Sequence, residues 1–322
     1  LPIPGLAEHG LGFKTLPDAV ALRNRAILQL ETAEEIDDPE ARREYLTFVY
    51  VGAGYAGLEG IAELQDYVAD LLDRYPRCRL DGTRWILVEA TDRVMPEIPP
   101  ALAEFATREL RSRGIEIHTN TRLEEVGERH ATLSTGERVA TRTVCWTAGV
   151  KPPKVVRELG LPLTEHGRIS TDATLRVEGQ ECVWAIGDAA AVPDPAQRGG
   201  RPCPPTAQHA LRQGRLVGEN VAAMLSGGRL RRFRYRTLGV FVDMGQHKAV
   251  ATAVGVHLRG FPAWFAARTY HLAAMPGVAR RLRLMVDWTV GLLFRRASAE
   301  LGALGRPDSL ATALDDPPGE PR

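Results

Sequence analysis

A glycine-rich turn near the start of the chain has the spacing needed to hold a phosphate group. An apolar run at 48–51 leads into Gly52-x-Gly54-x-x-Gly57, and a helical stretch follows. Gly52 permits a tight turn, Gly54 lets a pyrophosphate approach the backbone, and Gly57 lets helix and strand pack closely. The free N–H groups of the helix then favour an anion. A purely structural turn is the alternative, but the order strand, loop, helix, strand favours a dinucleotide site.

Two acidic residues could complete this site. Glu89 ends the second expected strand, where it can accept hydrogen bonds from both ribose hydroxyls and would repel a 2′-phosphate, which favours NADH over NADPH. Its distance from Gly57 exceeds the usual ~20 residues, and an exposed strand-end glutamate is the alternative. Glu59 follows the last glycine in the expected first helical turn. It either stabilises the helix start or projects toward the nicotinamide or a partner cofactor.

A second group of candidate residues lies beyond 180. The stretch 183–191, VWAIGDAAA, is predicted to be a strand followed by a loop. Its Asp188 can reach a polyol while the next N–H groups meet phosphate, although the motif alone indicates only a turn. Thr206 is a possible N-cap for a helix at 206–226, and Gln208 offers both a donor and an acceptor. An ordinary amphipathic helix is the alternative there.

Strands and helices alternate around the glycine loop. Strands are expected at 47–51, 85–88 and 115–118, with helices at 56–74 and 99–113 between them, which is the mononucleotide-binding half of a Rossmann fold. A strand at 142–146 ends near Gly149. Residues 1–14 are expected to form a loop, and a helix is expected to open at Thr15.

Composition excludes several classes of protein. The 322 residues are 44% apolar and 25% charged with a net charge of +1, which argues against a general nucleic-acid binder. The four cysteines form no C-x-x-C pair, so neither a zinc site nor a redox disulfide is indicated, and we expect inert thiols in a reducing cytosol. No apolar run reaches the ~20 residues of a transmembrane helix.

The stretch 255–301 combines arginines with aromatic and aliphatic residues. Arg280, Arg281 and Arg283 lie near an expected helix start, where the helix dipole disfavours cations. Anionic lipid headgroups would favour them there. A solvated charged face over a core-packed stripe is the alternative.

Three motifs occur in order along the chain: VGAGYAGLE, then TAGVKP followed by WAIGDAA, and CPPTAQHALRQG. With them the chain, from about residue 1 to 304, resembles the type II NADH:quinone oxidoreductases, single-subunit respiratory dehydrogenases that do not pump protons. The resemblance implies an α/β fold with two Rossmann-like dinucleotide-binding domains and a C-terminal amphipathic, helical, membrane-docking region. It implies FAD and NADH as cofactors, a membrane quinone as partner, and a peripheral place on the cytoplasmic face of the cell membrane. It leaves a homodimer open.

Roles follow from the resemblance position by position. Glu59 matches a family glutamate near nicotinamide and quinone, and Gln208 would lie beside the flavin ring at the quinone site. Arg212 occupies the position of the family's second glutamine, with Gln213 next to it. The residues expected to bind NADH or FAD are Gly52, Gly54, Gly57, Glu89, Gly149, Gly187, Asp188, Ala189 and Gln208.

The family's FAD glycine loop, which opens its chains, is not present in this sequence, so we expect an N-terminal truncation. The resulting division is 1–45 as a remnant of the FAD domain with linker helices, 46–149 as the NADH domain, 150–228 as the second part of the FAD domain, 229–304 as the quinone and membrane region, and 305–322 as a disordered tail. Two other readings stay open: a soluble flavoprotein reductase with another acceptor, and a redox-inert NADH-binding remnant.

Overall fold

The computed structural model describes residues 3–149, 152–195, 202–237, 239–253, 255–294 and 299. The chain divides into two compact units. The first combines Leu1–Ala148 with the stretch that begins at Gly239, and the second is built from Gly149–Leu238. Each unit is described separately.

A five-stranded parallel sheet forms the centre of the first unit, with strand order β1-β8-β2-β3-β4. Its strands are β1 (Gly10–Gly12), β8 (Thr143–Trp146), β2 (Thr47–Val51), β3 (Arg84–Val88) and β4 (Ile115–His118). Every residue of β2 is buried, as expected for a parallel strand covered on both faces. The strands predicted near 47–51, 85–88, 115–118 and 142–146 are therefore confirmed.

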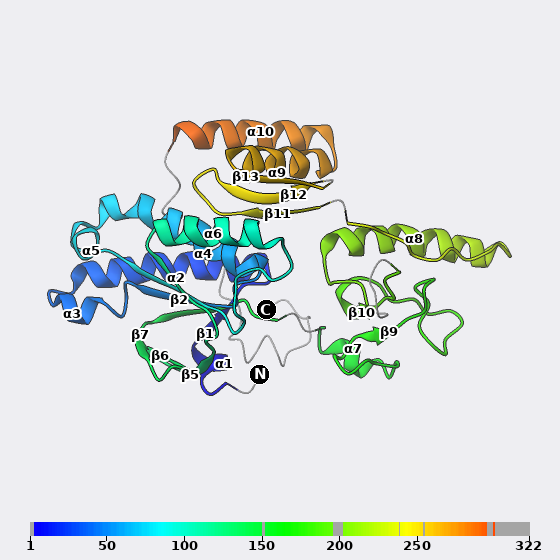
Figure 1. Ribbon diagram of the computed structural model, residues 1–322, viewed down its shortest axis with the longest axis horizontal. Coiled ribbons are helices and arrows are strands. Elements are labelled where there is room, and N and C mark those ends of the chain that lie inside the picture. The colour runs from blue at the N-terminus through cyan, green and yellow to red at the C-terminus, as the bar shows by residue number, and fades with distance from the viewer. Residues whose placement is uncertain are drawn as a thin grey trace. The chain divides into compact units, whose positions relative to one another are not determined.

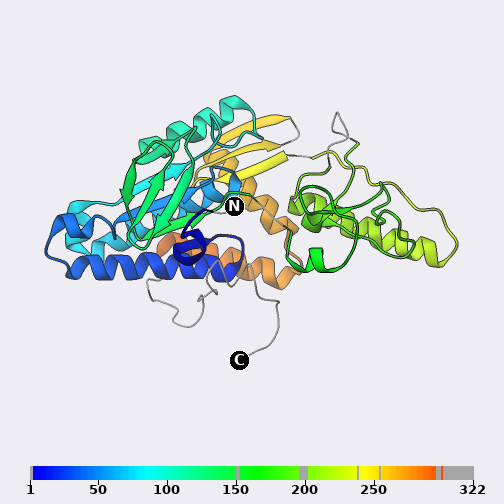
Figure 2. The same cartoon turned by 90° about the horizontal axis from the view of Figure 1, so that it is seen from below.

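Helices cover one face of this sheet (Figures 1 and 2). Phe48 and Trp85 stack with ring centroids 4.3 Å apart, and both belong to the core shared with the helices. Thr15 and Asp18 form a capping box that starts the first long helix, as predicted. The helices of this part are α2 (Leu16–Glu35), α3 (Pro39–Arg42), α4 (Tyr55–Leu71), η1 (Leu72–Arg74), α5 (Pro76–Asp81) and α6 (Pro100–Ser112).

A small antiparallel sheet covers the opposite face. Val49 and Ile86, which alternate with the helix-facing residues, pack there in a second core with Leu133. This layer consists of β5 (Leu123–Gly127), β6 (His130–Leu133) and β7 (Arg138–Ala140), with the short helix α1 (Leu6–His9) beside β5.

The prediction of a loop over residues 1–14 is wrong in part. Residues 6–9 are helical, and Gly10–Gly12 pair in parallel with Val144–Trp146 as the edge strand β1. Glycines have low strand propensity, so this strand depends on pairing with a partner far along the chain. Residues up to 45 thus pack in the same compact unit as the expected NADH domain.

A third layer comes from the C-terminal part of the chain. An antiparallel sheet, β11-β12-β13, packs on α4 and α6, and its other side carries α9 (Figure 1). The elements are β11 (Gly239–Asp243), β12 (Ala249–Ala253), β13 (Val256–Gly260), α9 (Phe261–Ala274) and α10 (Val278–Leu293).

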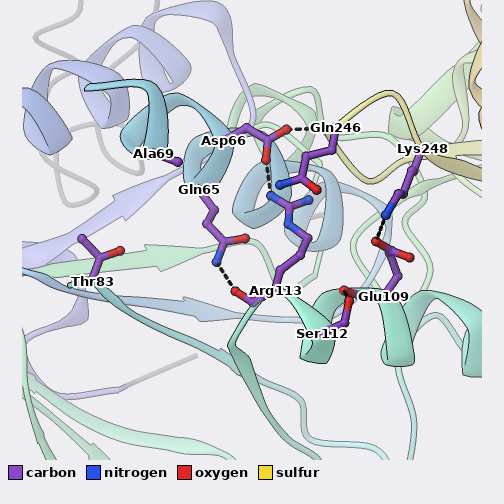
Figure 3. A pocket seen from close by; sticks show the side chains of 9 residues that line it. All are labelled: Gln65, Asp66, Ala69, Thr83, Glu109, Ser112, Arg113, Gln246 and Lys248. Atoms are coloured by element: carbon purple, nitrogen blue, oxygen red, sulfur yellow. Dashed lines mark hydrogen bonds and ion pairs between the residues drawn. The ribbon is translucent and has the colours of Figure 1, made fainter. Parts of the chain in front are cut away.

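A buried ion pair joins this layer to the helices. Arg113 pairs with Asp66, and both side chains are only 7% exposed. Arg113 also donates to the carbonyl of Met244, and Asp66 accepts from the backbone N–H of Gln246. Asp66, Arg113 and Gln246 are among the residues that line a polar pocket of about 390 Å³ (Figure 3). The polar side chains in it are largely paired with one another, so the pocket is chiefly a structural joint.

The second unit contains little regular sheet. Its elements are α7 (Val155–Glu158), β9 (Ile169–Ser170), η2 (Gly187–Ala189), β10 (Ala190–Ala191) and α8 (Ala207–Leu225). The strand predicted at the start of 183–191 is absent from the described residues, where Trp184 forms only an isolated bridge with Arg176. Phe233 is buried in the core of this unit, so residues 229–237 pack here and not with the C-terminal helices as the predicted division had it.

Candidate functional site

The glycine loop has the geometry that a dinucleotide needs. Gly52 has a φ of +103°, and a Cβ there would lie 2.8 Å from Ala148. A Cβ on Gly57 would lie 1.8 Å from the carbonyl oxygen of Gly52 and 2.6 Å from the hydroxyl of Thr147. Gly54, the N-cap of α4, has open space where its Cβ would be and provides no side-chain cap. The helix start is therefore bare at the point where a phosphate would approach.

Glu89 lies at the end of β3, as predicted, and its carboxylate reaches back to the glycine loop. One oxygen accepts from the backbone N–H of Ala53 at 2.7 Å, and the other accepts from the N–H and the hydroxyl of Thr91, each at 2.8 Å. The carboxylate is thus held beside the loop that would carry the pyrophosphate. This position suits a ligand of the adenosine ribose.

Glu59 does not cap its own helix, because it lies beyond the first turn of α4. Its carboxylate instead accepts from the backbone N–H of Asp243 in β11 at 3.0 Å. Burial, with the nearby charges of Asp243 and Glu63, raises the pKa of Glu59 to about 7 despite this hydrogen bond. Glu59 can therefore gain or lose a proton near neutral pH.

A pocket of about 400 Å³ opens over Glu59. Aromatic rings of Phe13, Phe241 and Trp288 form its apolar walls. Its polar groups are Glu59, Glu63, Asp243, Arg268 and His271. Aromatic walls with a few convergent polar groups are the usual form of a small-molecule site.

Arg268 supplies positive charge to this pocket. Its guanidinium lies 3.9 Å from the carboxylate of Asp243 and stacks on two rings, with centroid distances of 5.2 Å to Trp264 and 4.9 Å to Trp288. The stacked cation holds the aromatic wall in place. It also partly offsets the charge that Asp243 places near Glu59.

In the second unit, Gly187 and Asp188 lie on the turn η2 beside α8. Gly187 has a φ of +65°, and a Cβ there would lie 3.3 Å from the Cβ of Ala210. Its N–H donates to the side-chain oxygen of Gln213 at 2.7 Å, and Gln213 is 1% exposed. Asp188 and Ala189 are half-buried next to it. Gly149, also predicted to bind a cofactor, has a positive φ of +76° and is exposed.

Gln208 lies in the first turn of α8, where Thr206 is the N-cap as predicted. The side-chain oxygen of Gln208 accepts from the hydroxyl of Tyr235 at 2.6 Å. The guanidinium of Arg212 lies 4.1 Å from the centroid of the Tyr235 ring and donates to the Gln208 carbonyl at 2.9 Å. Arg212 therefore links the ring of Tyr235 to the backbone of Gln208. The side chain of Gln213 instead points inward and contacts Gly187.

A buried cluster of possible metal ligands in this unit was not predicted from the sequence. Atoms of Asp194, Cys203 and His209 that could each bind a metal lie within 4.8 Å of one another. Burial raises the pKa of Cys203 to about 11 and lowers the pKa of His209. In the sequence, Cys203 and His209 lie close together near the start of a helix. Their spacing matches no common zinc motif, so it did not indicate a metal site.

The fold and these sites define an α/β protein with a dinucleotide-binding loop and a second unit that carries a Gly-Asp turn. The sequence matches the pyridine nucleotide-disulphide oxidoreductase family over residues 1–214. The chain belongs to that family.

Two proteins of similar sequence indicate which members of the family this chain resembles. The chain is 30% identical over 289 residues to the demethylphylloquinone reductase NdbB of Synechocystis, covering 89% of this chain and 66% of the relative. It is 30% identical over 306 residues to the type II NADH:quinone oxidoreductase Ndh of Mycobacterium tuberculosis, covering 90% and 64%. The chain thus spans just under two thirds of these relatives. The resemblance drawn from the three motifs is confirmed.

Solved structures agree with this α/β fold. The structure of NDH2 from Plasmodium falciparum in complex with NADH matches with a TM-score of 0.85, covering 92% of this chain and 76% of that one at 15% identity.

Among the described residues, none of the helices has the length and apolar character needed to cross a membrane.

Proposed function

We propose that this chain supplies the NADH-binding domain and part of the FAD site of an enzyme that oxidises NADH and reduces a membrane quinone without pumping protons. The observation that carries the proposal is the half-buried Glu59, with a pKa of about 7, in an aromatic pocket next to the glycine loop. The two relatives above are named for quinone reduction.

On the NADH side, the loop residues bind and orient. The bare start of α4 receives the pyrophosphate, and the open space at Gly54 lets it come close. Glu89 exchanges its hydrogen bond from Ala53 for the ribose hydroxyls, and its charge disfavours a 2′-phosphate.

The residues of the second unit fit a flavin. Gly187 packs closely on Ala210 and has no side chain to block a ligand at this turn. The half-buried Asp188 next to it suits the ribityl hydroxyls. Ala189 offers its N–H near the phosphates, Gly149 contributes backbone, and Gln208 lies beside the ring. Bound there, FAD would supply the two-electron chemistry that links oxidation of NADH to reduction of the acceptor.

Glu59 holds the proton in this scheme. Reduction of a quinone to a quinol consumes two protons, and a carboxyl with a pKa near the working pH is suited to deliver one. The N–H of Asp243 fixes one oxygen of Glu59, and the aromatic walls limit water around the other. Arg268 lines the same pocket and would stabilise the negative charge that a quinone oxygen gains on reduction.

The C-terminal helices would dock on the membrane. Residues of α10 that expose apolar side chains are Val278, Leu282, Met285, Val286, Val290 and Leu293, and α9 adds Phe261 and Phe265. Arg280 and Arg283 are exposed beside them and suit anionic headgroups. The protein would thus be peripheral, on the cytoplasmic face of the cell membrane, where NADH is available.

The protein could also form a homodimer, which sedimentation equilibrium tests.

The test measures flavin content and NADH oxidation with and without a short-chain quinone, for this chain and for a form that includes any upstream coding sequence. We expect the form that retains flavin to be yellow and to oxidise NADH in a quinone-dependent way. Activity with dyes or proteins but not with quinone would support a soluble reductase. Absence of flavin and of activity in both forms would leave an NADH-binding remnant.

A further inference from the structure

Three side chains with metal-binding atoms converge in the second unit. Asp194 follows β10, Cys203 follows an isolated bridge between Pro193 and Pro202, and His209 lies in the first turn of α8. Their ligand atoms lie within 4.8 Å of one another. The residues are 7%, 1% and 5% exposed, respectively.

This burial sets the cluster apart from ordinary surface groups. The carboxylate of Asp194 belongs to this buried group. Here it shares its surroundings with a thiol and an imidazole, the two side chains that divalent zinc prefers. Among the described residues, this is the one group of at least three such side chains close enough to hold an ion.

We propose that Asp194, Cys203 and His209 bind a zinc ion. Zinc bonds of roughly 2.0 to 2.3 Å require the ligand atoms to lie between about 3 and 4 Å apart, so the widest pair must close by about 1 Å. On binding, the thiol of Cys203 loses its proton to solvent. The thiolate and the carboxylate then neutralise the two charges of the ion, and a fourth position stays open for water.

Neighbouring groups orient the histidine for this task. The hydroxyl of Thr206 lies 2.8 Å from Nδ1 of His209 and can accept a hydrogen bond from Nδ1–H, in the tautomer whose Nε2 carries the lone pair. Metal-bound histidines usually have such a partner on the other ring nitrogen. The ring also packs edge-on against Tyr235, at 5.0 Å between centroids.

A zinc ion here would fix the start of α8. Gln208 and Gln213 project from the same helix, the first toward Tyr235 and the second toward Gly187. The chelate would link the segment after β10 to this helix across three separate stretches of chain. Its role would be structural support for the unit that carries the proposed flavin residues, and it does not depend on the proposed function.

Cobalt binding to the metal-free chain tests the site. Cobalt(II) reports thiolate ligation by a near-ultraviolet charge-transfer band, and zinc should displace it. We expect one metal per chain, loss of the band in Cys203→Ser, and about a hundredfold weaker zinc binding in His209→Asn. Cys182→Ser and His166→Asn are matched controls, because both residues are exposed in the same unit and should leave the band and the affinity unchanged.

Two further variants guard against misfolding. Asp194→Asn keeps the shape of the side chain but removes its charge, and Thr206→Val removes the hydroxyl that partners His209 and also caps α8. Zinc affinity should fall about tenfold in each, and the circular dichroism of Asp194→Asn should stay native. Binding without a thiolate band, or binding that Cys203→Ser and His209→Asn leave intact, would overturn the site. So would a loss of the band in Cys182→Ser.

Discussion

The carboxylate of Glu59 accepts a hydrogen bond from the backbone N–H of Asp243, 3.0 Å away, although 184 positions separate the two residues. This contact joins the helix of the glycine loop to the C-terminal sheet. It also holds a half-buried titratable group in the lining of an aromatic pocket.

The stability of the chain should fall as pH rises through this titration. Glu59 has an ordinary pKa near 4.5 when unfolded and about 7 when folded, so between these values the folded state holds the extra proton. Stability is then lost from pH 4.5 upward and levels off above pH 7, by at most about 3 kcal/mol. Glu59→Gln keeps the acceptor and should flatten this part of the profile, measured by urea unfolding at pH 5 and pH 8.

Glu104→Gln is the control for that experiment. Its side chain is 70% exposed on α6, so its removal should leave the pH profile unchanged. Equal pH dependence in the native chain and in Glu59→Gln would show that Glu59 does not carry the titration.

Two glycines of the loop should respond differently to alanine. Gly57→Ala forces a Cβ against the carbonyl of Gly52 and should destabilise the fold by roughly 3 kcal/mol. Gly54→Ala meets open space at a φ of −74°, so stability should change by less than about 1 kcal/mol. NADH binding should nevertheless weaken about tenfold, because the methyl group lies where the pyrophosphate would approach. Thermal melting and NADH titration by calorimetry separate the two; tight NADH binding by Gly54→Ala would exclude this approach.

Glu89 should set the preference between NADH and NADPH. Glu89→Arg removes the ribose acceptor and adds a charge that attracts a 2′-phosphate, so the ratio of the two affinities should shift toward NADPH by about a hundredfold. Glu124→Arg makes the same charge change at an exposed position of β5 and should leave the ratio unaltered. The readout is fluorescence titration with each nucleotide. A ratio unchanged in Glu89→Arg would remove Glu89 from the site.

Membrane docking should depend on the exposed face of α10. Leu282 and Val286 are 57% and 61% exposed. Changing both to Asp should reduce binding to vesicles of anionic lipid at least about tenfold, since burial of each side chain contributes about 1.5 kcal/mol or more. Leu80, 86% exposed on α5, provides the control as Leu80→Asp. Vesicle co-sedimentation measures both, and an equal loss in the two variants would argue against a specific face.

The joint of Figure 3 should be costly to break. Asp66→Ala leaves the buried Arg113 without its carboxylate and should destabilise the chain by about 3 to 5 kcal/mol. Asp73→Ala breaks an exposed pair with Arg79 and should cost less than about 1 kcal/mol. Urea unfolding compares the two. Similar small losses would mean that the C-terminal sheet is held mainly by its apolar contacts.

Local sequence determined the central part of the first unit. The buried run of β2, the three glycines and the capping box at Thr15 each follow from rules that act within a few residues. The position of Glu89 was predictable for a similar local reason, because a side chain at the end of the strand beside the glycine loop must lie close to that loop.

Tertiary structure decided what depends on distant partners. Gly10–Gly12 become a strand only by pairing with β8, and the strand expected before Gly187 gives way to a single bridge. The raised pKa of Glu59 comes first from burial and then from the nearby charge of Asp243, on a strand that begins only at residue 239. The cluster of Asp194, Cys203 and His209 forms because three separate stretches bury their polar atoms in one place. Spacing along a chain encodes local geometry, whereas burial and hydrogen-bond partners exist only once the layers have packed.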